Sequence, residues 1–259
     1  MQASLPANSF KQELRQGRLL IGFWSSLCSN LSVEILAGSG FDWLLLDMEH
    51  APNEVPLLVG QLQAMTSATA AAVVRPAWND AVLIKRILDA GAQNLLVPYV
   101  QTAEEARAAV AATRYPEQGL RGVATAHRAN RFGRVKDYFQ RANEEMCIVV
   151  QIETRKALQN LEAIAGVEGV DGLFIGPSDL SASLGHLGNS GHPDVRHAIE
   201  DAGERIRKAG KAAGILAPIE ADARHWIEQG FTFVAVGGDA ALLARQTEEL
   251  AAKFKRISG

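Results

Sequence analysis

The chain of 259 residues is 47% hydrophobic and has a formal net charge of −3, a balance that gives no electrostatic argument for nucleic acid or an anionic membrane as a partner. No apolar run reaches the roughly 18 residues of a membrane span, residues 1–17 lack the apolar core of a signal peptide, and Cys28 and Cys147 lie too far apart for a disulfide framework or a metal knuckle. We therefore expect a cytoplasmic protein that forms one domain over residues 1–259.

Eight short apolar runs recur along the chain. They are rich in Val, Ile, Leu and Phe, are bounded by Gly, Asp or Pro, and cover residues 19–27, 41–50, 70–78, 94–100, 147–153, 170–177, 211–218 and 231–239. Continuous rather than alternating hydrophobicity is typical of parallel strands that are covered on both faces.

Amphipathic segments with apolar residues three and four positions apart separate these runs. They cover residues 32–40, 53–65, 80–92, 102–113, 154–167, 192–210, 219–230 and 240–256. Eight strands that alternate with eight helices predict an α/β fold of the (β/α)8 (TIM) barrel type. The alternative is an open doubly wound sheet, which is disfavoured because no glycine-rich dinucleotide-binding motif follows the first strand.

One connection is long: residues 114–133 precede a further helical segment at 135–146. A long loop inside a compact domain is usually functional, so we expect it to pass near a site or a subunit interface. Its His127, Arg128 and Arg131 would either be solvated surface residues or anchor an anionic substrate end or a neighbouring subunit.

Carboxylates gather where the strands are expected to end, which is the face that carries the active site of a (β/α)8 barrel. They are Asp47, Glu49, Glu153, Asp179 and Asp239. Several carboxylates in one partly buried pocket repel one another and need a cation. Oxygen ligands suit Mg2+, with Mn2+ or Co2+ as substitutes. We take Glu153 and Asp179 as the metal ligands; the alternative is that each caps the helix that follows it.

His50 and Arg75 also lie at expected strand ends. His50 beside a metal would act as a general base or activate a metal-bound water, unless it is a capping or core histidine. The guanidinium of Arg75 needs an anion, either a substrate oxygen or a structural partner in Asp47 or Glu49. No lysine ends an expected strand, so an enolate formed here would be stabilised by a metal and not by a Schiff base.

Several long motifs make the chain similar to a known family. The segments GFDWLLLDMEHAPN, VVRPAWND, LLVPYVQTAEEARAAVAATRYP, GLRGV, VQIET, GVDGLFIGPSDLSASLG and TFVAVGGD resemble those of the HpcH/HpaI family of class II, metal-dependent pyruvate aldolases. The likeness runs from about Phe10 to the C-terminus. Within the family, HRANRFG, GPSDLSASLGHLGN, HPDV and GILAPIEADAR are most similar to the members that cleave 5-keto-4-deoxy-glucarate (2-dehydro-3-deoxyglucarate).

The resemblance implies a role for each candidate site residue. It makes His50 the base, Asp89 the residue that raises its basicity and Arg75 the group that stabilises the enolate, although Asp89 alone reads as an ordinary helix-end residue. The remaining implied roles are metal binding by Glu153 and Asp179, substrate contact by Gln151, Ser178, Asp179 and Leu216, and support of the site by Asp47 and Glu49.

The resemblance also implies a reaction and an assembly. The reaction is retro-aldol cleavage of a 4-hydroxy-2-oxo acid to pyruvate and an aldehyde. The first expectation is 5-keto-4-deoxy-glucarate, which gives tartronate semialdehyde, and the alternative is 4-hydroxy-2-oxoheptanedioate, which gives succinate semialdehyde. The assembly is a homo-hexamer, a trimer of dimers, with active sites near subunit boundaries and the last helix exchanged.

Two other classes of function stay open. A phosphate-binding barrel isomerase or synthase is suggested by the glycine-rich VAVGGD at residues 234–239. A barrel that binds without catalysis is the third class.

Overall fold

Parallel strands form a closed barrel at the centre of the molecule. The computed structural model describes residues 4–255, and within them eight strands pair in the order of the sequence, with β1 closing against β8. They are β1 (Leu20–Ser25), β2 (Trp43–Asp47), β3 (Ala71–Arg75), β4 (Asn94–Val97), β5 (Cys147–Ile152), β6 (Gly172–Ile175), β7 (Ala212–Leu216) and β8 (Phe233–Gly238). Each predicted strand segment contains one of them, so the (β/α)8 prediction is confirmed.

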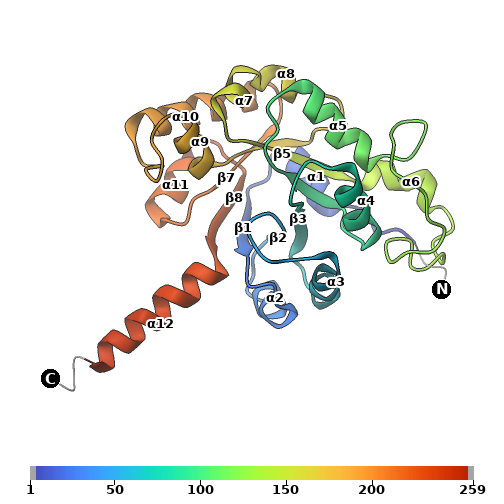
Figure 1. The fold of residues 1–259 in the computed structure, drawn as a ribbon, viewed down its shortest axis with the longest axis horizontal. Helices are drawn as coiled ribbons and strands as arrows, with labels where there is room; N and C mark the ends of the chain where they lie inside the picture. Colours follow the sequence, from blue (N-terminus) through green and yellow to red (C-terminus); the bar gives the residue numbers. More distant parts are fainter. Residues whose placement is uncertain (1–3, 256–259) are drawn as a thin grey trace.

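Helices connect the strands and surround the barrel (Figure 1). They are α2 (Asn30–Ala37), α3 (Val55–Ala64), α4 (Ala81–Asp89), α5 (Ala103–Thr113), α6 (Tyr138–Glu145), α7 (Arg155–Gln159), α8 (Leu161–Ala165), α10 (Pro193–Lys208) and α11 (Glu220–Glu228). The segment predicted as one helix over 154–167 divides at Asn160, whose φ of −102° and ψ of 11° leave the helical range.

Two further helices were not predicted from the sequence. α1 (Ser9–Arg15) precedes β1, and α9 (Pro177–Ser183) directly follows β6. α1 places Phe10 and Leu14 in the hydrophobic cluster that fills the barrel, with the Phe10 ring 5.5 Å from that of Phe233. The amino-terminal end of the barrel is thus filled by apolar side chains, because Leu20 and Phe233 begin their strands there.

The long connection over residues 114–137 lies at that amino-terminal end, since it joins the end of α5 to α6, which leads directly into the start of β5. It does not therefore pass near the strand ends that carry the carboxylates of the same chain. Arg121, His127 and Asn130 are buried in it, so His127 is not a solvated surface residue. A role at a subunit interface stays a prediction.

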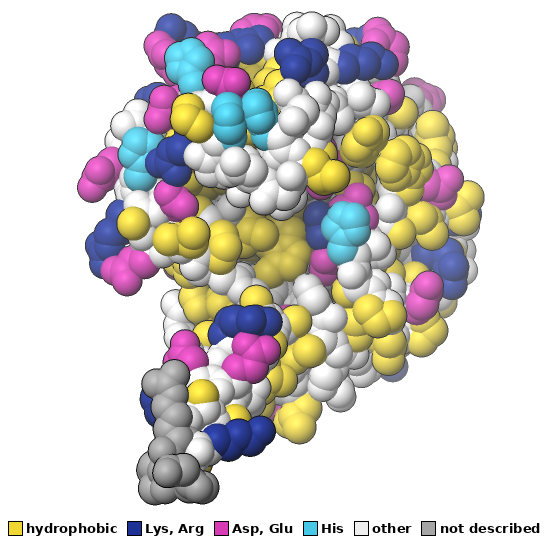
Figure 2. All heavy atoms as spheres, turned by 60° about the vertical axis from the view of Figure 1, so that its left-hand side comes forward, with side chains coloured by type: hydrophobic (Ala, Val, Ile, Leu, Met, Phe, Trp, Pro, Cys, Tyr) yellow, Lys and Arg dark blue, Asp and Glu magenta, His cyan; other side chains and the backbone are white. Residues whose placement is uncertain are grey.

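The last helix, α12 (Asp239–Lys255), extends away from the barrel (Figure 1). Its Leu242, Leu243 and Leu250 are exposed, and Figure 2 shows hydrophobic side chains among the charged ones on the surface of this helix. The exchange of this helix between subunits stays a prediction, and Arg256, the last residue of the predicted helix, lies outside the described residues. None of the helices within residues 4–255 has both the length and the apolar character that a membrane span needs.

Candidate active site

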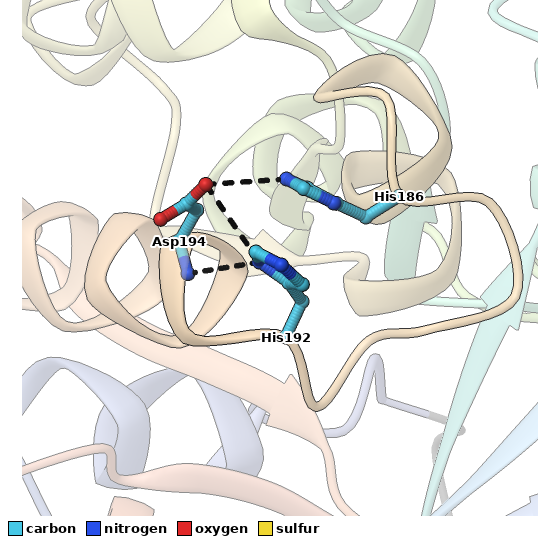
Figure 3. Close-up of side chains that lie close together, drawn as sticks. All are labelled: His186, His192 and Asp194. Atoms are coloured by element: carbon cyan, nitrogen blue, oxygen red, sulfur yellow. Dashed lines mark hydrogen bonds and ion pairs between the residues drawn. The ribbon is translucent and has the colours of Figure 1, made fainter.

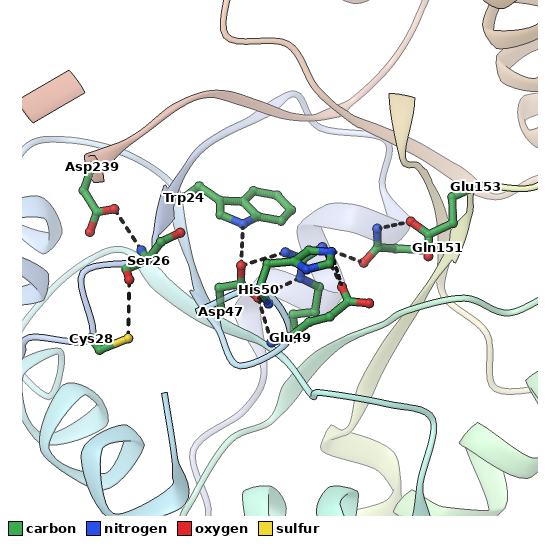
Figure 4. Close-up of polar contacts among 10 residues, drawn as sticks. Trp24, Ser26, Cys28, Asp47, Glu49, His50, Gln151, Glu153 and Asp239 are labelled. Carbon is green, nitrogen blue, oxygen red and sulfur yellow. Dashed lines mark hydrogen bonds and ion pairs between the residues drawn. The ribbon is translucent and has the colours of Figure 1, made fainter. Parts of the chain in front are cut away.

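The carboxyl-terminal ends of β2, β3 and β5 bring together a group of charged and amide side chains (Figure 4). Asp47 and Arg75 are direct partners in the β2–β3 register, so the last residues of two adjacent strands point to the same place. The other members are Glu49, which follows β2, and Gln151 and Glu153 from the end of β5. The expectation that these five residues meet at one face of the barrel is met.

Arg75 is the centre of the group. Its Nε and Nη2 donate to the two carboxylate oxygens of Asp47, at 2.9 and 2.6 Å, and its Nη1 lies 2.8 Å from Oε2 of Glu49. Nη1 also donates to Oε1 of Gln151 at 3.4 Å, and the guanidinium lies 5.0 Å from the ring centre of Trp24. Both structural partners proposed for Arg75 are therefore present, and Asp47 holds the planar fork by two bonds.

Asp47 is fixed from several sides. Trp24 Nε1 donates to it at 3.3 Å, and the amides of Glu49 and His50 donate to its Oδ1 at 3.0 and 3.4 Å. Burial raises the pKa of Asp47, but the hydrogen bonds and the charge of Arg75 outweigh burial and hold it below its usual value. Asp47 thus stays ionised and keeps Arg75 in place.

Glu153 has a different environment. It is 3% exposed, and its carboxylate accepts hydrogen bonds from the backbone amide of Tyr99 at 2.7 Å and from Gln151 Nε2 at 2.9 Å. Burial, together with the charges of Glu49 and Asp179, raises the pKa of Glu153 to about 7 against the opposing effects of Tyr99 and Arg75. This carboxylate therefore lacks sufficient positive charge nearby.

Glu49 shows the same excess of negative charge. Burial is the largest cause that raises its pKa, the charges of Asp47 and Asp179 add to it, and Arg75 and His50 oppose it. One guanidinium thus faces several carboxylates. A divalent cation would balance them, because it favours the ionised form of each carboxylate around it.

Gly176, which directly follows β6, lets the carboxylate of Glu153 pack closely against the backbone. A Cβ atom at Gly176 would lie 2.5 Å from Oε2 of Glu153, so a side chain there would displace this carboxylate. Gly176 directly precedes α9, which presents Ser178 and Asp179 as exposed residues of its first turn. The carboxylate oxygens of this group are donors that fit a hard divalent ion.

The remaining predicted residues lie around this group. His50 follows β2 with 65% of its side chain exposed, and its Nε2 is 3.8 Å from Oε2 of Glu49. Leu216 ends β7 and is half-buried against the apolar side chains of the barrel interior. His50 is thus open to solvent and to a substrate at the mouth of the barrel.

Asp89 is not near His50 within one chain. It is the last residue of α4, which runs back from the end of β3 toward the start of β4 and so ends at the amino-terminal end of the barrel. There it accepts a hydrogen bond of 2.7 Å from Arg121 Nη2, and His127 Nε2 is 3.9 Å away. The expected contact of Asp89 with the imidazole of His50 is not formed in the single chain, because a helix of nine residues separates the two ends.

Asp239 was expected to join the carboxylate group, but it binds the segment that follows β1 instead. It is buried at the start of α12 and accepts from the amides of Ser26 and Leu27, at 2.8 and 3.3 Å, and from the Ser25 hydroxyl at 3.1 Å. Asp239 therefore fixes the loop after β1 (Figure 4).

Three contributors to the site were missed from the sequence. Tyr99 acts through its backbone amide and has a φ of 57°, a region that non-glycine residues rarely adopt. Trp24 donates a hydrogen bond to Asp47, and Gly176 acts through having no side chain. The glycine at the end of a predicted strand was the one available signal.

Comparisons with known proteins agree with this geometry. The family described as HpcH/HpaI aldolase/citrate lyase matches residues 20–245. A protein of Klebsiella pneumoniae named 4-hydroxy-2-oxo-heptane-1,7-dioate aldolase is 60% identical over 95% of this chain and 94% of its own length. A protein of the same name from Salmonella dublin is 56% identical over 97% of each chain.

A solved structure shows the same fold. The crystal structure of an HpcH/HpaI aldolase/citrate lyase family protein from Burkholderia cenocepacia is 42% identical, superimposes with a TM-score of 0.93, and is matched over 96% of this chain and 100% of its own. The family expected from the sequence motifs is confirmed: this (β/α)8 barrel belongs to the HpcH/HpaI aldolase/citrate lyase family and is a carbon–carbon lyase.

Proposed function

We propose that the chain cleaves 4-hydroxy-2-oxoheptanedioate to pyruvate and succinate semialdehyde in a divalent-metal-dependent retro-aldol reaction. The observation that carries the chemistry is the buried carboxylate of Glu153, whose pKa is raised to about 7 beside Glu49 and Asp179. The observation that carries the substrate is the name shared by relatives that are 56–60% identical.

This proposal corrects the first expectation for the substrate. The motifs had favoured 5-keto-4-deoxy-glucarate, whereas the relatives of high identity are named for the heptanedioate, the alternative. The two substrates share the pyruvate-forming half and differ only in the aldehyde. One of these motifs, HRANRFG, lies in the long connection at the amino-terminal end of the barrel, so within one chain it cannot separate the two substrates.

The reaction requires one proton acceptor and one place for developing negative charge. His50 removes the proton of the C4 hydroxyl, and the C3–C4 bond breaks. The C4 oxygen becomes the aldehyde carbonyl, and the bonding electron pair forms the enolate of pyruvate, which is then protonated at C3. His50 suits this role because its imidazole is exposed at the mouth of the barrel beside Glu49.

Arg75 is placed to stabilise the enolate oxygen. Asp47 holds its Nε and Nη2, and this turns Nη1 toward Glu49 and Gln151. Charge placed in advance at a desolvated site is the largest single source of rate enhancement in many enzymes. A substrate oxygen that replaces Gln151 at Nη1 would be held in the plane of the guanidinium.

Glu153 and Asp179 would hold the metal. A bound divalent ion supplies Lewis-acid stabilisation of the 2-oxo-acid oxygens and of the enolate. Gln151 and the amide of Tyr99 orient Glu153 for this task. Mg2+ suits these oxygen ligands best, with Mn2+ or Co2+ as substitutes. Ser178 and Leu216 would contact the pyruvate part from α9 and β7.

Asp89 enters the proposal only through a second copy of the chain, because its own His50 lies at the other end of the barrel. Mixing two inactive variants tests this. If Asp89 of one copy serves His50 of another, a His50→Ala variant mixed with an Asp89→Asn variant regains part of the activity. Mixing without any recovery would remove Asp89 from the site.

The substrate is tested by pyruvate release from both candidates with the purified enzyme. We expect a higher kcat/KM on 4-hydroxy-2-oxoheptanedioate, loss of activity with a chelator, and recovery with Mg2+. A higher kcat/KM on 5-keto-4-deoxy-glucarate would overturn the substrate, and activity that is indifferent to the chelator would overturn the metal.

A further inference from the structure

A second group of metal-ligand side chains lies outside the carboxylate site. His186, His192 and Asp194 come from the loop between α9 and α10 and from the first turn of α10 (Figure 3). One ligand atom from each lies within 4.8 Å of the others. Among the described residues, this is the one group of three His, Cys, Asp or Glu side chains that meets this distance. The proposed reaction does not use it.

The loop itself brings the two imidazoles together. The amide of His186 donates to the Ser181 carbonyl at 2.7 Å, and the amide of His192 donates to the Asn189 carbonyl at 3.1 Å. The two rings stack with their centres 3.6 Å apart and their planes at 15°. This arrangement is built into the backbone and is not an accidental meeting of long side chains.

The contacts within the group place two acceptors face to face. His192 Nδ1 accepts from the Asp194 amide at 3.2 Å, so in the neutral ring this nitrogen carries a lone pair. The same nitrogen lies 3.7 Å from Oδ2 of Asp194, which is also an acceptor. His186 Nε2 is 3.3 Å from that oxygen. A cation between the three atoms would take the lone pair of His192 Nδ1 in place of the Asp194 amide, because the unprotonated nitrogen of a neutral imidazole has a single lone pair.

The distances match those around a tetrahedral ion. Ligand atoms about 2.1 Å from such an ion lie about 3.4 Å from one another. The two nitrogen–oxygen separations, 3.3 and 3.7 Å, are close to this value. Because the rings are stacked nearly parallel, their lone pairs lie in separate planes, so the rings must rotate out of the stack for both to bind one ion. Their exposed fractions of 25% and 32% leave room for that rotation.

The structural alternative is a helix cap. His192 accepts from an amide of the first turn of α10, and Pro193 follows it, as at many helix starts. A cap explains His192 and the position of Asp194. It does not explain why a second imidazole from a separate part of the loop stacks on His192 and meets the same carboxylate oxygen.

We propose that His186, His192 and Asp194 form a second metal site that binds a borderline divalent ion such as Zn2+, separate from the Mg2+-type site at the barrel mouth. Two imidazoles and one carboxylate are a ligand set that selects Zn2+ over Mg2+. The bound ion ties the loop over residues 184–192 to the first turn of α10, and water fills its fourth position.

Equilibrium dialysis of the full chain against Zn2+ in excess Mg2+ tests this site. The variants are His186→Ala and His192→Asn; asparagine keeps the cap, because it is among the best N-cap residues. We expect one zinc per chain that survives Glu153→Gln and that binds at least about tenfold more weakly in either histidine variant. The matched control is His225→Ala, since His225 pairs with Glu200 at 3.2 Å without a second imidazole.

Folding is checked by Mg2+-dependent pyruvate release without zinc, which both histidine variants should retain because neither residue belongs to the reaction site. Equal zinc binding in wild type, His186→Ala and His192→Asn would overturn the site. Zinc that disappears in Glu153→Gln and persists in the histidine variants would assign the ion to the barrel mouth instead and also overturn it.

Discussion

Each end of the barrel holds a buried arginine, and the two arginines have different surroundings. Arg75, at the carboxyl-terminal end, contacts Asp47, Glu49 and Gln151 through all three of its nitrogens. Arg121, at the amino-terminal end, contacts Asp89 and the Tyr138 hydroxyl through Nη2 alone. Within the described residues, its Nε and Nη1 have no hydrogen-bond partner.

Aromatic rings take the place of carboxylates around Arg121. Its guanidinium lies 4.6 Å from the ring centre of Tyr115 and 6.0 Å from that of Tyr138. Such contacts hold a cation without adding negative charge. Carboxylates therefore outnumber the guanidinium around Arg75 but not around Arg121, and an ion is proposed to bind at the Arg75 end. At the amino-terminal end, the contacts of Arg121 with Asp89 and Tyr138 hold the long connection in place.

The largest expected effect is at Glu153. Glu153→Gln keeps the bond from the Tyr99 amide but removes the charge, so we expect metal-dependent pyruvate release to fall at least about 100-fold. The matched control is Glu162→Gln, the same change at a carboxylate that forms only an exposed pair with Arg205. Near-normal activity in Glu153→Gln would mean that an excess of carboxylates does not define the active end.

Arg121→Met should act on stability and leave the carboxylate group of its own chain unchanged. The change leaves Asp89 without its cation, and breaking such a buried pair costs about 3–5 kcal/mol in the free energy of unfolding. Denaturant unfolding measures this cost. Arg224→Met, at an exposed pair with Glu220, is the control and should stay within about 1 kcal/mol of the wild type. Equal costs in both variants would contradict a structural role for Arg121.

A smaller effect is expected from pH. The pKa of Glu153 is raised to about 7, so below that pH the carboxyl carries a proton that must leave before an ion binds. The apparent Kd for Mg2+ should therefore rise about tenfold for each pH unit below 7 and level off above it. Calorimetric titrations between pH 5.5 and 8 give this slope. A Kd that is flat across this range would show that Glu153 does not hold the ion.

The smallest effect is expected at the rim. The rings of Trp78 and Tyr99 lie 5.5 Å apart, and both residues are exposed. Trp78→Leu removes this contact at a cost of about 0.5–1.5 kcal/mol. We expect a shift of a few degrees in Tm and little change in the Kd for Mg2+, because the Tyr99 amide stays in place. A loss of Mg2+ binding would show that the aromatic pair, and not the backbone, positions Glu153.

The sequence predicted the carboxyl-terminal end better than the amino-terminal end, for a physical reason. Residues such as Asp47 and Arg75 end adjacent parallel strands, so their position in the chain determines that they meet. Arg121 and Asp89 meet through a loop and a helix end, and no periodicity places them. Contacts made by the backbone, such as the Tyr99 amide, also leave no signal in residue type.

The backbone bond from Tyr99 to Glu153 separates two properties of the enzyme. The site uses only the amide of residue 99, which every residue except proline provides, whereas the side chain at this position is exposed and lies beside the Trp78 ring with the two planes tilted by 31°. Substitutions at residue 99 that tolerate its left-handed backbone, such as asparagine or glycine, can therefore replace the exposed ring beside Trp78 without removing the bond that orients the proposed metal ligand. For enzyme engineering, this position offers a way to alter the surface beside the site while the bond to Glu153 stays intact.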